Sequence, residues 1–442
     1  MTSAGPTMRP RNVDYYLQRL NAYSKNTIRM RPQTKETYVA GDTAVFRLPT
    51  NALLDLHTMY LRCDLTLNNT GSTVTGALLP KYAETFIRRV DVTLGGVQAG
   101  LGSLHDYGGC FSLMALNSVP VGKNETDLAI LGLGGHQTRD QRAKGDFWAA
   151  TNTGAGVTTV QPIVISNWMG LLGGQYVRFL DTNLLPDIEI RITWASKYVV
   201  ACKGSANATI DANSYTMSNL NLQCETVQFG DGSYRQMVDA RLASGEPIVI
   251  PFANWAGFES SATSNTSTTQ FTVATQSLNA VYGTLRAGDY DSAKGSSSLD
   301  SDTLPGVRAT GPVLSETVSV KAADGTTNVS VPTGFLIDKP NECLTTPYYQ
   351  FRSLDGAGGE NNSATYQLII DSKLYPQFQA TSVDAYMLTK NSFDGSGLNR
   401  DFVHGIPSRR AFENFAFALG ISLDHHDAGD SLKDRLISGL NT

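Results

Sequence analysis

The sequence contains few residues whose types and spacing could do chemistry, and the clearest group is Asp424-His425-His426-Asp427. Carboxylates and imidazoles are the side chains that bind zinc and related metals. Adjacent histidines on an extended segment point to opposite faces of the backbone, so they rarely bind the same ion. We interpret this cluster as a surface turn and expect no metal site there.

The usual catalytic signatures are absent from the sequence. It has neither the G-x-S-x-G motif of α/β-hydrolases nor the H-E-x-x-H motif of zinc proteases. The glycines of LGLGG (Leu131–Gly135) follow no strand–helix junction of the kind that binds dinucleotides. Carboxylate pairs of the glycosidase type depend on spacing in three dimensions, and nothing in the sequence singles one out. We therefore predict a protein that is not an enzyme and has no cofactor.

Basic residues are concentrated at the N-terminus. Up to residue 35 the chain has seven Lys and Arg residues and a single acidic one, Asp14, which gives a net charge of +6. Because the whole chain carries −5, the remainder carries −11. Such an arm could bind nucleic acid, a membrane surface or an acidic protein face, and a solvated tail is the alternative. The basic residues are Arg9, Arg11, Arg19, Lys25, Arg29, Arg31 and Lys35.

The composition favours an all-β protein. Charged residues make up only 17% of the chain, and it contains 41 glycines. Helical bundles need more Glu and Lys on their exposed faces. The N-terminus lacks the apolar core of a secretion signal, and no apolar run reaches membrane-spanning length.

The clearest structural pattern is a strand at residues 188–194. Ile188, Ile190, Ile192 and Trp194 alternate with polar residues, which is the pattern of a strand with one buried face. Roughly eight such strands precede residue 230, which is the number in one jelly roll. The strand pattern then starts again after a helix predicted near residues 230–246.

We therefore predict two tandem eight-stranded jelly-roll β-sandwiches. The predicted parts are a basic N-terminal arm (1–35), a first jelly roll (36–229), a linker helix (230–246) and a second jelly roll (247–442). The second jelly roll carries a long insert at 287–347, rich in Gly, Ser, Thr and Asp. Within this insert the segment ETVSVKAADGTTNVSVP predicts a hairpin that turns at Asp324-Gly325.

Four segments resemble, in order, those of double jelly-roll major capsid proteins, particularly from polinton-like viruses and virophages. They are FRLPTNALLDLHTMYLRCDL (Phe46–Leu65), FIRRVDVTLGG (Phe86–Gly96), YVRFLDTNLLPDIEIRITWA (Tyr176–Ala195) and YQLIIDSKLYPQ (Tyr366–Gln377). Each is a generic strand pattern, and the resemblance lies in their combination over most of the chain.

The five cysteines are scattered and never form C-x-x-C, which indicates reduced, structural thiols and synthesis in the host cell interior. The resemblance implies the major capsid protein of an icosahedral DNA virus, located in the virion shell. It implies a homotrimer whose six sandwiches form a pseudo-hexagonal capsomer, in contact with neighbouring capsomers and with penton and minor capsid proteins. Loops 120–160 and 287–347 would face outward, and the basic arm would face the genome, an inner membrane or minor capsid proteins. Open alternatives are a β-sandwich spike, adhesin or lectin, and a β-sandwich glycosidase.

The second half departs from the family pattern at its end. Strands can be named only up to residues 415–423, although closing the sandwich requires about two more strands. We expect these strands to lie beyond the given C-terminus or to come from a partner, because an open edge rich in phenylalanine invites aggregation.

Overall fold

The structure is a computed structural model of the whole chain. It describes residues 23–69, 74–78, 80, 82–98, 104–118, 158–173, 178–204, 213–229, 232–245, 250, 252–261, 267–275, 277–286, 290–291, 317–321, 328–332, 351, 353, 364–394, 412–413, 416–423 and 440.

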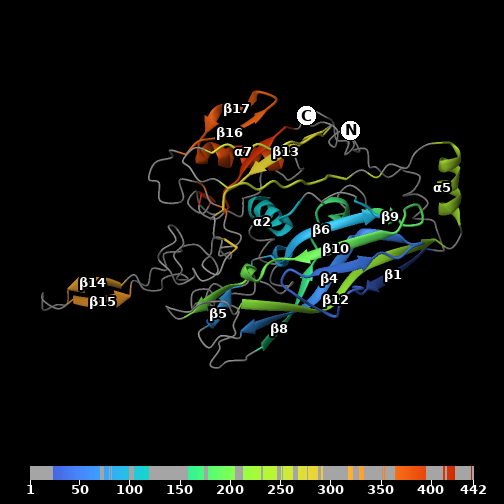
Figure 1. Cartoon of the computed structure of the whole chain (residues 1–442), viewed down its shortest axis with the longest axis horizontal. Helices are drawn as coiled ribbons and strands as arrows, with labels where there is room; N and C mark the ends of the chain where they lie inside the picture. The colour runs from blue at the N-terminus through green and yellow to red at the C-terminus, as the bar shows by residue number, and fades with distance from the viewer. Residues whose placement is uncertain are drawn as a thin grey trace, which may run out of the picture.

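Two antiparallel sheets face each other in the first half of the chain (Figure 1). The first sheet runs in the order β1 (Tyr23–Met30), β12 (Asn213–Phe229), β4 (Leu53–Asn69), β8 (Thr158–Ile165), with β2 (Thr37–Val39) on β12 and β9 (Phe179–Asp181) on β4. The second runs β3 (Thr43–Arg47), β10 (Ile188–Trp194), β6 (Ile87–Leu94), β7 (Val97–Gln98). A separate ribbon joins β5 (Val74–Leu78) to β11 (Ala201–Gly204).

The longer strands alternate between the two sheets along the chain. Strands β4, β8 and β12 belong to the first sheet, and β3, β6 and β10 belong to the second. Neighbours within a sheet are therefore distant in sequence, as in the pairing of β4 with β12. Crossing from sheet to sheet in this way is the connectivity of jelly rolls and Greek keys. The all-β prediction is confirmed.

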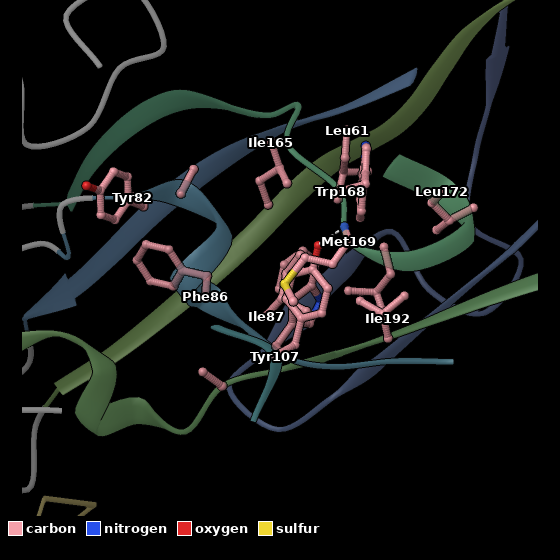
Figure 2. Packing of buried hydrophobic residues seen from close by; sticks show 14 of the residues in the cluster. Leu61, Tyr82, Phe86, Ile87, Tyr107, Ile165, Trp168, Met169, Leu172 and Ile192 are labelled. Atoms are coloured by element: carbon pink, nitrogen blue, oxygen red, sulfur yellow. Dashed lines mark hydrogen bonds between the residues drawn. The ribbon is translucent and has the colours of Figure 1, made fainter. Parts of the chain in front are cut away.

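The core lies between these sheets, where their alternating apolar faces meet. The predicted face of β10 is buried: Ile188, Ile190, Ile192 and Trp194 are all at most 3% exposed. From the opposite sheet, Leu61 reaches the same core (Figure 2). Close packing of this kind leaves the molecule little freedom to deform.

The described part of the first half also contains short helical elements, which contact strands of both sheets. These are η1 (Ala83–Phe86), α2 (Tyr107–Ser118), η3 (Gly170–Gly173) and η4 (Lys197–Val199). The sequence pattern of residues 101–115 fits either a short helix or irregular chain, and the structure has α2 from Tyr107 to Ser118. In Figure 1, α2 lies between the first sandwich and the elements of the second half.

A helix, α5 (Ser233–Ala243), follows the sandwich inside the range 230–246 for which the sequence predicts a linker helix. Glycines flank it at both ends, with left-handed φ angles of 67° at Gly232 and 77° at Gly245. A left-handed glycine just after a helix is a common terminator.

The described strands of the second half form three antiparallel pairs. These are β13 (Ala280–Gly283) with β18 (Leu419–Ser422), β14 (Thr317–Lys321) with β15 (Asn328–Pro332), and β16 (Tyr366–Ile370) with β17 (Lys373–Ala380). Helix α7 (Ser382–Asp394) packs beside β18. The pairing of β14 with β15 confirms the predicted hairpin, whose turn lies outside the described residues.

The first sandwich begins earlier in the chain than the sequence predicts. Residues Tyr23–Met30, assigned to the N-terminal arm, form β1 and pair with β12 along their whole length. Ile28 and Met30 pack against the core, which explains why this segment is held in the sheet. The boundary predicted at residue 36 is corrected accordingly.

Candidate functional site

The predicted basic residues do not gather into one site in the described part of the chain. Arg9, Arg11 and Arg19 lie outside the described residues. Lys25 and Arg29 are exposed on the edge strand β1, where Lys25 pairs with Glu225 at 3.2 Å. Arg31 is exposed just beyond that strand, and Lys35 lies 3.0 Å from Asp42.

Within the described residues, no group of three His, Cys, Asp or Glu side chains could hold a metal ion. The cluster Asp424-His425-His426-Asp427 lies outside them. No helix of the described chain is both long enough and apolar enough to cross a membrane.

An ion pair of the first sandwich joins Asp55 on β4 to Arg178 next to β9. Asp55 is fully buried, and the Arg178 guanidinium approaches both of its oxygens, with Nε at 3.1 Å and NH2 at 3.0 Å from Oδ2. Arg178 also lies 5.1 Å from the centre of the Phe179 ring. A two-pronged arginine–carboxylate contact fixes direction as well as distance.

This ion pair ties together segments that are far apart in sequence. Strand β9 pairs with β4 through Leu53 and Leu54, and β10 lies between β3 and β6. The described parts of the three segments of the first half that resemble capsid proteins, 46–65, 86–96 and 178–195, therefore belong to one sandwich. The fourth segment, 366–377, spans β16 and the start of β17.

A second buried polar group lies under α2. Glu84 is 3% exposed, and its Oε1 accepts hydrogen bonds from the backbone N–H of Asn167 at 3.2 Å and from its Nδ2 at 2.9 Å. Burial raises the pKa of Glu84, and the hydrogen bonds only partly oppose this. The Tyr107 hydroxyl accepts from the Met169 N–H at 3.0 Å, and the two side chains lie together in Figure 2.

The described cysteines have the character of structural thiols. Cys63 and Cys224 are buried and free, and Cys110 is free and partly buried. Burial raises the pKa of Cys224 to about 11, so its thiol stays protonated and unreactive at neutral pH.

The core of the first sandwich continues into the second half. Phe351, Ala385, Phe412 and Phe417 belong to the same buried cluster as the inner faces of β4 and β10. The rings of Phe412 and Phe417 are 5.5 Å apart, and Tyr366 lies 4.9 Å from Phe417. The two halves are therefore packed together as one body.

Sequence reasoning missed both Asp55 and Glu84. Asp55 stands in the apolar run LLDL, and a charged residue in such a run was the available signal that it had a buried partner. Its partner Arg178 lies 123 residues away, and no local pattern connects the two.

Comparison with known proteins gives structural likeness and no sequence match. No family model matches the sequence, and no curated protein matches it. PBCV-1 VP54, as fitted into a reconstruction of the virophage Sputnik, is 10% identical with a TM-score of 0.39, covering 92% of this chain and 78% of that one.

Two further solved structures are similar at the same identity. A quasi-atomic model of the PBCV-1 virus capsid has a TM-score of 0.39 at 10% identity, covering 95% of this chain and 81% of that chain. The mavirus major capsid protein has a TM-score of 0.28 at 10% identity, covering 46% of each chain.

Proposed function

We propose that this chain is the major capsid protein of an icosahedral DNA virus, and that three copies form a pseudo-hexagonal capsomer. The observation that carries the proposal is that three capsid-like segments lie in the two facing sheets of one sandwich, where β4 belongs to the first sheet and β10 pairs with β6 in the second. Those segments are generic strand patterns when taken singly. Their assembly into one sandwich with sheet-to-sheet crossings is what a jelly-roll shell protein requires.

The packing of the two halves supports the same proposal. A capsomer has to keep its shape while it contacts several neighbours, so its sandwiches need a fixed relative position. The buried cluster that runs from β4 to Phe417 supplies this, because close-packed interiors resist deformation. Three rigid copies of the chain in closed threefold contact would then form one capsomer.

The proposed partners follow from this role. They are two further copies of the chain, neighbouring capsomers, and penton and minor capsid proteins, all within the virion shell after synthesis inside the host cell. The basic residues from Arg9 to Lys35 would face the genome, an inner membrane or minor capsid proteins. Of the residues assigned to that arm, Tyr23–Met30 pair with β12 in the first sheet.

Expression of the chain with its minor capsid proteins, followed by electron microscopy, tests the proposal. We expect closed particles or flat arrays with pseudo-hexagonal units. A monomeric protein that forms no such assemblies and instead binds glycans on an array, or releases sugar from them, would replace the proposal by an adhesin, lectin or glycosidase.

A further inference from the structure

Arg286 occupies a largely buried position where the two halves meet. Only 13% of its side chain is exposed. Its NH2 lies 2.6 Å from Oδ2 of Asp106 in the first half and 3.3 Å from Oε1 of Glu259 in the second. Its guanidinium also stacks over the Tyr290 ring, with 4.1 Å between Cζ and the ring centre. An arginine in such a cage combines ion pairing with cation–π attraction.

Asp106 is held in place by the helix that it starts. Its Oδ1 accepts a hydrogen bond from the Gly109 N–H at 3.2 Å, so Asp106 caps the N-terminus of α2. The positive end of the helix dipole favours a carboxylate at this position. A Cβ atom on Gly109 would lie 2.0 Å from Oδ2 of Asp106, so only glycine leaves room for the carboxylate.

The other end of α2 is also bonded to the second half. Asn117, 2% exposed, donates from Nδ2 to the backbone oxygen of Leu113 at 2.8 Å and to that of Ala416 at 3.2 Å. Ala416 lies three residues before β18. One helix of the first half is therefore bonded to the second half through both of its ends.

The start of the long insert is joined to the first half as well. Asp291, five residues after Arg286, lies 3.5 Å from Arg88 on β6 and accepts a hydrogen bond from Ser196 after β10. These contacts and those of Arg286 lie on the same short stretch of chain, so they restrain the same junction.

We propose that α2 connects the two halves so that they unfold together, and that Arg286 is the positioning residue that fixes one half relative to the other. The pair Arg286–Asp106 joins one end of α2 to the second half, and Asn117–Ala416 joins the other. The expected effect on assembly rests on the proposed capsid function, because a capsomer whose subunits have mobile halves would not form regular contacts. The expected effect on unfolding concerns the isolated chain alone.

Native-state hydrogen exchange in increasing urea tests this on the full chain. In the unmodified protein, the segments that contain α2, α7 and β18 are expected to lose protection at the same urea concentration as β10. In Arg286→Met, α7 and β18 are expected to lose protection at lower urea while β10 remains protected. Asp106→Asn should do the same, since asparagine caps helices as well as aspartate and only the charge is removed.

Matched variants separate this role from general destabilisation. Lys25→Met removes an exposed ion pair of the first sandwich. In this variant α2, α7, β18 and β10 should still lose protection at the same urea concentration. Arg286→Lys keeps the charge but loses the planar stacking, and should give a smaller separation than Arg286→Met. Coincident exchange in both Arg286→Met and Asp106→Asn would overturn the proposal, as would separate opening of the halves in the unmodified protein.

Size-exclusion chromatography with light scattering on the unmodified chain and on Arg286→Met distinguishes this inference from the proposed function. If the unmodified chain forms trimers and Arg286→Met remains folded but does not, the positioning role extends to assembly. If the unmodified chain forms none, the capsid proposal fails while the exchange result still decides the role of α2.

Discussion

At the residue scale, the pair formed by Asp55 and Arg178 joins β4 to the start of β9. Asp55 is fully buried, and the Arg178 side chain is 38% exposed, so water screens one partner. Asp55 also accepts a hydrogen bond from the His57 N–H at 3.2 Å. Its carboxylate therefore contacts both the start of β9 and the part of β4 where the register with β12 is irregular.

We predict that Asp55→Asn lowers the free energy of unfolding by about 1–3 kcal/mol, since a charge-assisted contact is lost at a buried site. Urea denaturation followed by circular dichroism measures this. The control Lys25→Met breaks an exposed pair and should cost less than about 1 kcal/mol. An equal loss of unfolding free energy in the two variants would show that the pair of Asp55 with Arg178 stabilises the fold no more than an exposed pair does.

Glu84 makes the stability of the protein depend on pH. Burial raises its pKa in the folded chain above the ordinary value of 4.5, so folding favours the protonated form. The folded state therefore binds more protons than the unfolded state as pH rises from 4.5 towards the raised value. Over that range the contribution of Glu84 to stability falls, and the full penalty of the buried charge is present above it.

We predict that Glu84→Gln removes this contribution. The free energy of unfolding of the variant, relative to the unmodified chain, should rise with pH above 4.5, as measured by urea denaturation at several pH values. Asp384 provides a control of opposite sign, because hydrogen bonds from Thr381 lower its pKa. Asp384→Asn should therefore lose stability, relative to the unmodified chain, as pH rises through the range where Asp384 ionises. If the difference in unfolding free energy between Glu84→Gln and the unmodified chain does not change with pH, the buried Glu84 is not the cause of the pH dependence.

At the scale of elements, α7 and β18 approach each other very closely. The Thr389 hydroxyl donates to the Ala418 oxygen at 2.6 Å and accepts from the Gly420 N–H at 2.8 Å. A Cβ on Gly420 would lie 2.5 Å from Oγ of Ser392 and 3.0 Å from Cα of Thr389. The helix can therefore rest on this strand only where the strand has no side chain.

We predict that Gly420→Ala destabilises the second half by about 1–3 kcal/mol, because an added methyl group overpacks this contact. Gly283→Ala is the matched control on the paired strand β13, since no atom lies within 4 Å of the added Cβ. Thermal unfolding of both variants measures the difference. A loss of similar size in the two variants would show that the close approach is not the cause.

Individual elements differed in how far the sequence predicted them. Strand β10 was predicted residue by residue, because one of its faces meets the core and the other does not. The alternation expected at residues 415–423 is weaker in the structure: Ala416, Phe417, Ala418 and Ile421 are all buried, since both faces of this segment are covered. The segment PIVIPF (Pro247–Phe252) has the apolar pattern of a strand, but its described residues Ile250 and Phe252 pack against the core as irregular chain.

At the scale of the whole molecule, the two predicted domains share one core. Phe351 and Phe417 belong to the cluster that also contains Leu61 and Ile192. Sequence periodicity reports which face of an element is buried, but not which element covers it. The contacts that unite the halves, Arg286 with Asp106 and Asn117 with Ala416, link residues far apart in the chain, so no local pattern could predict them.

The mass of the protein in solution tests the central claim most directly. Size-exclusion chromatography with light scattering on the full chain should give about 143 kDa, three copies of 47.6 kDa, since threefold association is what turns the paired halves into a tile. A stable monomer of 47.6 kDa at the concentrations used for assembly would contradict the account.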